Sequence, residues 1–494
     1  MNPTDLRAKR PSAQWREQSG VLFILNRELD RPDNSGRKLQ LSLLDEAAAP
    51  VEHSDDEIPR GAKQMCKTIT LGATLVVALT TVGWREVEAT HSTSSTAVVL
   101  KWNQLLQSTL PQPGNPATPR FYAMTHIAMF DAINAIERDF EPYRVRLRPG
   151  LGGSTKAAAA QAAHDVLVAL NPSAAAAYDE ALAADLGGRP SGFVRRGAEI
   201  GAHVAREILA WRQNDGWVVP SFPPYAEPPL PGRWQPTPPA NTAATFTHLQ
   251  HAAPMALLSA TQVLPSPPPS LTSERYAADL NEVKLLGKSD SAMRTEEQTT
   301  ISRLWSGVGT TTGFFSVWNN VARDVVLARK LSLVEAARMF VLLNVSIHDA
   351  LQTTQASKFV YGVWRPVTAI RAADTDLNPD TDPDSTWLPL ITTPPYPAYA
   401  GNLATIGASA ARALQLVCGT NDLPVAVTWS LSGGLPDVTR HYDGFWPAAE
   451  EEAMARIHGG IHYRFDQEAG QQVGRSVAEF VFANFVRPRA RWFD

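Results

Sequence analysis

The chain of 494 residues carries a net charge of −4 and has a pI near 6.3. Because such a chain has no overall positive field, binding to nucleic acid or to an acidic membrane surface is not expected, and a small or neutral partner is favoured. Its two cysteines, Cys66 and Cys418, exclude a disulfide framework and a cysteine-based zinc site. Any metal must be held by histidine and carboxylates, or as an oxyanion by cations.

The N-terminal region has the pattern of an exported protein. Residues 1–64 are polar without a sustained apolar period, so they are predicted to be disordered or not part of the natural product. One lysine, an apolar run over residues 69–84 and a small-residue cleavage site then form a signal-peptide pattern over residues 65–89. The run is shorter than the roughly 20 residues that a spanning helix needs, and an uncleaved anchor is the alternative. We therefore expect a secreted or periplasmic protein without stable membrane association.

From Thr90 onward, apolar residues recur at helical spacing and strand-like alternation is scarce. A proline-rich connector that starts at Pro220 divides an N-terminal helical layer, residues 90–240, from a C-terminal bundle, residues 241–494. The predicted fold class is all-α, a packed helical bundle. The helices predicted in the first part cover about residues 121–136, 155–170, 173–185 and 193–213.

In the second part, Ser332 and Glu335 have capping-box spacing and open a long core helix that runs into the first motif. Further helices are expected to begin near Asn402 and near Ile461. The core helix leads into the stretch KFVYGVWRP, in which Lys358 and Arg365 are seven residues apart.

Seven residues are two helical turns, so Lys358 and Arg365 are predicted to point from nearly the same face before Pro366 ends or kinks the helix. Two cations on one face repel each other, and a chain tolerates this arrangement best when an anion lies between them. The alternative is a solvated pair that flanks an aromatic patch.

The stretch ARIHGGIHYRFD contains Arg456, His462 and Asp466. A helix that begins after Gly459 and Gly460 would place His462 and Asp466 on one face. A carboxylate that accepts the Nδ1 proton of His462 would leave Nε2 as a bare lone pair, suited to a metal or a phosphorus centre. Taken singly, Arg456 could be a helix cap and His462 a satisfied core histidine.

Between these two stretches lies YAGNLATIGASAARAL, residues 399–414. A turn of small residues leads into an alanine-rich helix, whose first N–H groups are predicted to be free for an oxyanion. The alternative is an ordinary loop that is capped by Asn402. Leu403 in the first helical turn offers no polar group to an oxyanion.

In this order, the three stretches resemble the signature of the vanadium-dependent haloperoxidases and the related type 2 phosphatidic acid phosphatases: K-x6-R-P, then P-S-G-H, then S-R-x5-H-x3-D. The spacings of the first and third blocks match in full. Most of residues 98–485 also resembles the bacterial secreted branch of the haloperoxidases. The stretches that carry this wider similarity lie near Trp102, His126, Trp234 and Asp349 and after Trp364.

The resemblance implies a helical bundle of the vanadium haloperoxidase and acid phosphatase type that binds vanadate, with phosphate as a competing oxyanion. Five-coordinate vanadate mimics the transition state of phosphoryl transfer, so one scaffold can serve both chemistries. His462 would be the vanadium ligand or phosphoryl acceptor, and Asp466 would orient it. The groups that would neutralise or bind the oxyanion oxygens are Lys358, Arg365 and Arg456, helped by the N–H groups of Gly401 and Asn402.

Leu403 occupies the position of the signature histidine that acts as general acid and base. Leucine cannot transfer a proton, and loss of such help typically lowers the rate by roughly 10²–10⁴-fold. Ala455 in place of serine and Asn402 in place of glycine are smaller departures. His458, four residues before His462, is the candidate catalytic replacement if the turn is helical, and an exposed His458 is the alternative.

Three functions are compatible with these residues. The leading hypothesis is a peroxidase that uses hydrogen peroxide to oxidise a halide or a small organic substrate. The second is a phosphatase with His462 as nucleophile; the lack of membrane-embedded helices around the motifs argues against an integral lipid phosphatase. The third is an inactive homologue that binds an oxyanion, for which Leu403 is the main argument.

Overall fold

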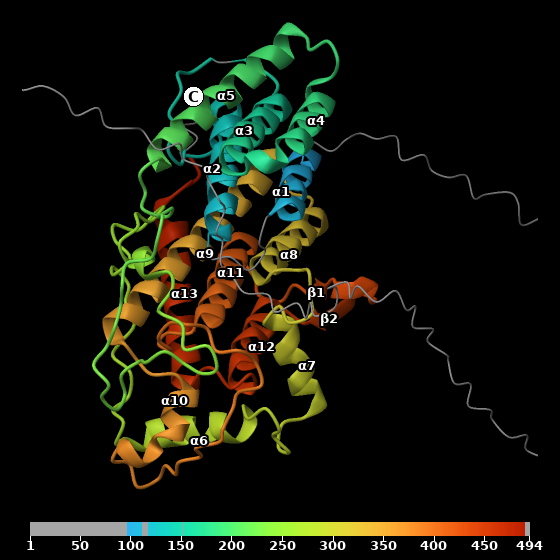
Figure 1. Cartoon of the computed structure of the whole chain (residues 1–494). Coiled ribbons are helices and arrows are strands. Elements are labelled where there is room, and N and C mark those ends of the chain that lie inside the picture. Colours follow the sequence, from blue (N-terminus) through green and yellow to red (C-terminus); the bar gives the residue numbers. More distant parts are fainter. Residues whose placement is uncertain (1–95, 111–116, 151, 490–494) are drawn as a thin grey trace, which may run out of the picture. The chain divides into compact units, whose positions relative to one another are not determined.

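Thirteen α-helices and one two-stranded sheet make up the regular structure of the residues that the computed structural model describes, 96–110, 117–150 and 152–489 (Figure 1). The predicted all-α class is confirmed. The predictions for residues 1–64 and 65–89 lie outside the described residues. Within the described ranges, no helix is both long and apolar enough to cross a bilayer.

The helices predicted from the alanine-rich periodicity of the first part are present close to the predicted positions. Helix α3 packs between α2 and α5, and α2 in turn packs on the later helix α9. Almost every side chain of α2 is buried, because this helix has neighbours on several sides. The helices of this layer are α1 (Ala97–Thr109), α2 (Thr118–Glu137), α3 (Thr155–Leu170), α4 (Ala175–Leu186) and α5 (Gly192–Arg212).

Helix α9 (Leu333–Tyr361) is the central element of the second part, and α2, α11 and α13 pack around it (Figure 1). The predicted capping box is confirmed: the Ser332 side chain accepts from the N–H of Glu335, whose carboxylate accepts from the N–H of Ser332. The other α-helices are α6 (Glu274–Leu286), α7 (Glu296–Trp305), α8 (Phe314–Arg329), α10 (Pro366–Arg371), α11 (Asn402–Cys418), α12 (Phe445–His458) and α13 (Arg464–Asn484). Strands β1 (Val425–Trp429) and β2 (Val438–Tyr442) pair antiparallel.

A buried carboxylate holds the irregular segment that follows the proline-rich connector against α9. Asp349 accepts the backbone N–H groups of Met255, Ala256 and Leu257 at 2.8, 2.7 and 2.8 Å. Three such bonds satisfy a carboxylate that would otherwise be costly to bury. This segment is thereby fixed to the same helix that carries Lys358.

Helices α11 and α13 approach closely because glycines face the contact. A Cβ at Gly474 would meet the carbonyl oxygen of Thr405 at 2.5 Å and the nitrogen of Ser409 at 2.7 Å. Both atoms belong to the backbone of α11, so they cannot rotate away as a side chain could. The close contact fixes the position of α13 relative to α11, and these two helices carry two of the three motifs.

We predict that Gly474→Ala lowers the unfolding free energy. Overpacking costs about 1–3 kcal/mol or more, which exceeds the roughly 1 kcal/mol that alanine gains over glycine in a helix. Denaturant unfolding measures the difference. Gly188→Ala is the matched control, since a Cβ there meets nothing within 4 Å. Equal unfolding free energies for the two variants would contradict the packing argument.

Candidate oxyanion site

His462 lies in a turn between α12 and α13, and Asp466 reaches back to it from the first turn of α13. Asp466 Oδ2 is 2.8 Å from His462 Nδ1 and also accepts the N–H of Tyr463 at 3.1 Å. The prediction of one helical face was wrong, because Gly460 adopts a φ of 79° and α13 begins only at Arg464. The expected contact between histidine and carboxylate is nevertheless present.

Lys358 and Arg365 also lie on separate elements rather than on one helical face as predicted. Helix α9 ends at Tyr361, Gly362 takes the left-handed conformation with a φ of 61°, and Arg365 precedes Pro366 at the start of α10. The two cations still meet at one aromatic ring. Lys358 Nζ and Arg365 Cζ lie 5.4 and 5.0 Å from the ring centroid of Tyr396.

Lys358 is fully buried, and its ammonium donates to the carbonyl oxygens of Ala398 at 2.8 Å and Ala400 at 2.5 Å. Burial, and next the charge of Arg365, lower the pKa of Lys358 well below its usual value. Two neutral carbonyls do not compensate a buried ammonium as an anion would. Lys358 is therefore a cation whose surroundings favour a nearby negative charge.

Arg365 is likewise fully buried and directs its guanidinium toward His462. Its Nε donates to the carbonyl oxygen of Tyr396 at 2.7 Å, and Nη1 donates to that of Ile461 at 2.9 Å and lies 3.1 Å from His462 Nε2. Its Nη2 is buried without a hydrogen-bond partner. This unpaired donor indicates that the arrangement is built for a further acceptor.

Arg456 comes from the last turn of α12. Its Nη1 donates to Ser306 Oγ at 2.5 Å, whereas its Nε is buried without a partner. Burial lowers the pKa of Arg456 to about 10. One turn earlier, Glu452 is fully buried, and burial raises its pKa well above its usual value. Because burial disfavours the charged form of Glu452, this carboxyl competes less with an oxyanion for the charge of Arg456.

Burial and these cations together keep His462 neutral. Burial is the main cause that lowers the pKa of His462 well below its usual value, followed by the charges of Arg365, Lys358 and Arg456. Burial raises the pKa of Asp466 to about 7, against the opposing charge of Lys358. A neutral imidazole that keeps its Nδ1 proton toward Asp466 presents its Nε2 lone pair to the cations.

The N-terminus of α11 completes this region, with one correction to the predicted donors. The N–H of Gly401 donates to the carbonyl oxygen of Asp466 at 2.8 Å, so it is not free for an oxyanion. Asn402 begins the helix, and its N–H belongs to the first-turn groups that have no partner within the helix. Leu403 follows, 5% exposed and packed in the apolar core.

Gln467 is a site residue that the sequence interpretation missed. A Cβ on Gly401 would meet the Nε2 of Gln467 at 2.6 Å, so the amide lies directly against the turn before α11. Both polar atoms of this amide are buried without a hydrogen-bond partner. Gln467 therefore offers a donor and an acceptor beside the candidate oxyanion pocket.

His458 is not brought into this cluster. It is buried rather than exposed, and the charged groups that act on the pKa of His458 differ from those that act on the pKa of His462. Those around His458 are Glu282, Arg294, Arg464 and Glu451, and those around His462 are Arg365, Lys358 and Arg456. Gly459 and Gly460 separate the two histidines and break the helix on which the predicted shared face depended.

The donor set fits a tetrahedral oxyanion. Three buried cations supply charge, the unpaired Arg365 Nη2 and Arg456 Nε supply hydrogen-bond donors, and His462 Nε2 supplies a ligand atom. Among the described residues, no group of three or more histidine, cysteine or acidic side chains could hold a bare metal ion. Vanadate or phosphate thus suits these residues, whereas a hydrated divalent cation does not.

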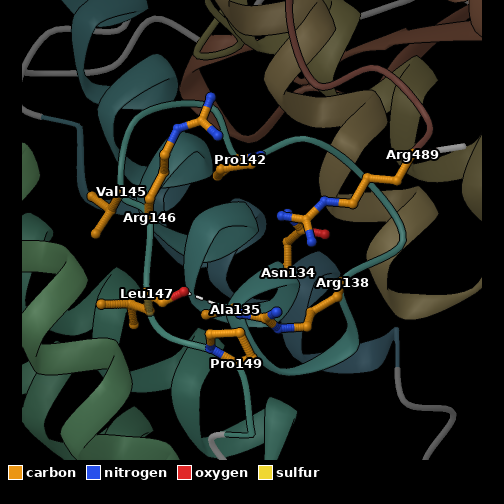
Figure 2. A pocket seen from close by; sticks show the side chains of 9 residues that line it. All are labelled: Asn134, Ala135, Arg138, Pro142, Val145, Arg146, Leu147, Pro149 and Arg489. Carbon is orange, nitrogen blue, oxygen red and sulfur yellow. Dashed lines mark hydrogen bonds between the residues drawn. The ribbon is translucent and has the colours of Figure 1, made fainter.

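A second cationic region, at the end of α2, is a separate pocket of about 240 Å³ (Figure 2). Arg138, Arg146 and Arg489 line it, but it shares no residue with the site around His462. Arg138 Nη2 donates to the carbonyl oxygen of Leu147 at 3.0 Å, as the dashed line in Figure 2 shows. No histidine that could act as a vanadium ligand lines this pocket, so the candidate vanadate site is assigned to the region around His462.

The fold and the site together describe a helical bundle in which one neutral histidine faces three buried cations. Several known proteins are similar to the chain. Residues 338–490 match the family model of the VCPO second helical-bundle domain. The vanadium chloroperoxidase of Curvularia inaequalis is 25% identical over 241 residues, which are 37% of this chain and 38% of that protein. The chain thus matches less than half of the length of this relative.

Solved structures extend the similarity to most of the described chain. A bacterial vanadium-dependent iodoperoxidase superposes with a TM-score of 0.67 at 22% identity, over 80% of this chain and 97% of that one. A holo-type bacterial vanadium-dependent chloroperoxidase superposes with a TM-score of 0.58 at 13% identity, over 75% and 92% of the two chains. The family-model match and the Curvularia relative confirm the resemblance to the vanadium haloperoxidase superfamily, and the solved structures show that the chain has the helical fold of these proteins.

Proposed function

We propose that the protein is a vanadium-dependent haloperoxidase-like enzyme, which uses hydrogen peroxide to oxidise a halide or a small organic substrate at a histidine-bound vanadate. The observation that carries this proposal is the neutral His462, held by Asp466 at 2.8 Å and surrounded by Lys358, Arg365 and Arg456. The signal-peptide pattern over residues 65–89 supports export of the protein as part of the same proposal.

The chain's own residues would perform three tasks. Bound vanadate would supply the peroxide chemistry. Asp466 would hold the proton on Nδ1 of His462, so that Nε2 remains the ligand atom, and the three cations would neutralise the oxyanion charge in a site shielded from water. Leu403 contributes no proton transfer, so turnover is expected to be slow.

The first test is peroxide-dependent bromination of a dye by the full chain, with and without added vanadate. We expect slow turnover that requires vanadate, and vanadate at 100 times its Kd should stabilise the fold by about 2.7 kcal/mol. In His462→Ala, the vanadate affinity measured by ⁵¹V NMR should fall at least about tenfold, because the ligand atom is lost. Unchanged affinity in this variant would show that the assigned pocket is wrong.

Two other functions follow from particular residues. A phosphatase that uses His462 as nucleophile is compatible with the lone pair at Nε2, and hydrolysis of p-nitrophenyl phosphate with trapping of phosphohistidine would reveal it. An oxyanion-binding protein without turnover is favoured by the buried, apolar Leu403. Vanadate binding without bromination or phosphate release would identify this third function.

A further inference from the structure

A further pocket, besides the oxyanion site and the arginine-lined pocket, lies where proline-rich segments meet the end of α9. This pocket has a volume of about 240 Å³. Its apolar wall consists of flat rings and two branched side chains, Leu271 and Val363, and Arg233 stands at its rim. The wall residues that matter for recognition are Pro268, Pro269, Leu271, Tyr276, Tyr361 and Phe465.

Hydrogen bonds place the inner wall of this pocket one side-chain layer from the oxyanion site. The wall residue Val363 accepts, through its carbonyl oxygen, the N–H of Ala398 at 2.9 Å, and the carbonyl oxygen of Ala398 accepts from Lys358. Phe465 stacks on Tyr463 with 4.7 Å between the ring centroids, and Tyr463 directly follows His462. The two sites are therefore neighbours, although they share no residue.

The polar groups of the apolar wall are already engaged within the protein. The hydroxyl of Tyr361 donates to the carbonyl oxygen of Pro265 at 2.6 Å, and the hydroxyl of Tyr276 accepts from Trp364 Nε1 at 3.1 Å. A ligand in this pocket consequently meets mainly ring faces and proline rings, although the hydroxyl of Tyr276, which accepts in that bond, keeps its own proton to donate. Such surfaces favour a flat aromatic ring.

Arg233 would favour a negatively charged ligand. Its side chain is 46% exposed, and Nη1 donates to the carbonyl oxygen of Tyr361 at 3.2 Å. Glu227 forms an ion pair with Nη1 at 3.8 Å, a distance too long for a hydrogen bond, so the guanidinium N–H groups keep donors for a ligand. A wall that contains aromatic and proline rings, with an arginine that keeps such donors, matches an aromatic ring that carries one carboxylate.

We propose that this pocket binds small monocyclic aromatic carboxylates, with the ring against Tyr361, Phe465 and the prolines and the carboxylate on Arg233. The pocket has room for one substituted benzene ring. The proposal deepens the proposed function by naming the class of organic substrate that would be held beside the oxidation site, and it rests on that function only in calling the ligand a substrate. Binding itself requires neither vanadate nor turnover.

The experiment is saturation-transfer NMR of the full chain with benzoate, without vanadate or phosphate. Benzoate is expected to bind. Cyclohexanecarboxylate, which lacks the aromatic ring, and benzyl alcohol, which lacks the negative charge, are expected to bind more weakly. Ser270→Trp should fill the pocket and reduce benzoate binding by at least about tenfold, and Arg233→Ala should reduce it about two- to fivefold, as for an exposed ion pair. Ser270 is exposed at the rim, so the indole can enter without disturbing the core.

Ser259→Trp is the matched control, because Ser259 is also exposed and pairs with Thr261 as Ser270 pairs with Thr272, both at 3.1 Å. Equal benzoate binding by the two tryptophan variants would overturn the proposal. So would loss of benzoate binding on addition of orthophosphate or in His462→Ala, because the ligand would then lie in the oxyanion site. Benzoate binding that survives in a protein without bromination activity would support the pocket and reject the peroxidase.

Discussion

Leu403→His is expected to raise vanadate-dependent bromination by roughly 10²–10⁴-fold, the range that general acid–base catalysis typically contributes. Leu403 is the second residue of α11 and follows the turn that Gln467 and Asp466 hold in place. An imidazole there would lie at a helix N-terminus and at a buried position, and both features favour its neutral form. A neutral imidazole can accept a proton from hydrogen peroxide at neutral pH.

The measurement is the rate of dye bromination at saturating vanadate, beside Leu403→Gln. Glutamine is polar and similar in size but cannot act as a base, so it tests whether proton transfer rather than polarity restores the rate. Vanadate affinity should change little in either variant, because Lys358, Arg365, Arg456 and His462 remain. Equal rates for the two variants at equal vanadate occupancy would remove the acid–base explanation.

The sequence predicted the helices well because their information is local. Ser332 and Glu335 form the expected capping box, and α3 and α11 begin at or next to the predicted residues. The local pattern failed where backbone turns intervene. Gly362 in the left-handed conformation separates Lys358 from Arg365, and Gly460 separates α12 from α13. A helical wheel cannot show where such a glycine ends the helix.

The residues of the candidate site were identified by resemblance to motifs, whereas their surroundings depend on long-range contacts. Tyr396 covers two cations, Ser306 binds Arg456, and Gln467 lies against Gly401. No spacing in the sequence links these residues to their partners, because each contact joins separate elements. The same limitation explains His458: four residues suggest one helical turn, but the break after α12 gives it different neighbours from those of His462.

Lys358→Met is expected to lower oxyanion affinity by about 10²–10³-fold, since losing one partner of a buried charge pair costs about 2–5 kcal/mol. Without an oxyanion, however, the unfolding free energy at pH 7 should not fall by more than about 1 kcal/mol. Loss of the bonds to Ala398 and Ala400 is unfavourable, but relief of a desolvated ammonium beside Arg365 is of similar size or larger. Function and stability should therefore diverge at this position.

The pH dependence supplies a second readout. Because the pKa of Lys358 is lower in the folded than in the unfolded protein, the unfolded state binds more protons between the two values, and stability rises with pH across that window. Lys358→Met should lack this rise, and Lys156→Met, at a half-exposed position on α3, should retain it. Denaturant unfolding at several pH values, with orthophosphate titration by calorimetry, measures both quantities. A variant that loses stability yet keeps its orthophosphate affinity would show that Lys358 is a structural residue, and that the cations around His462 do not form an oxyanion site.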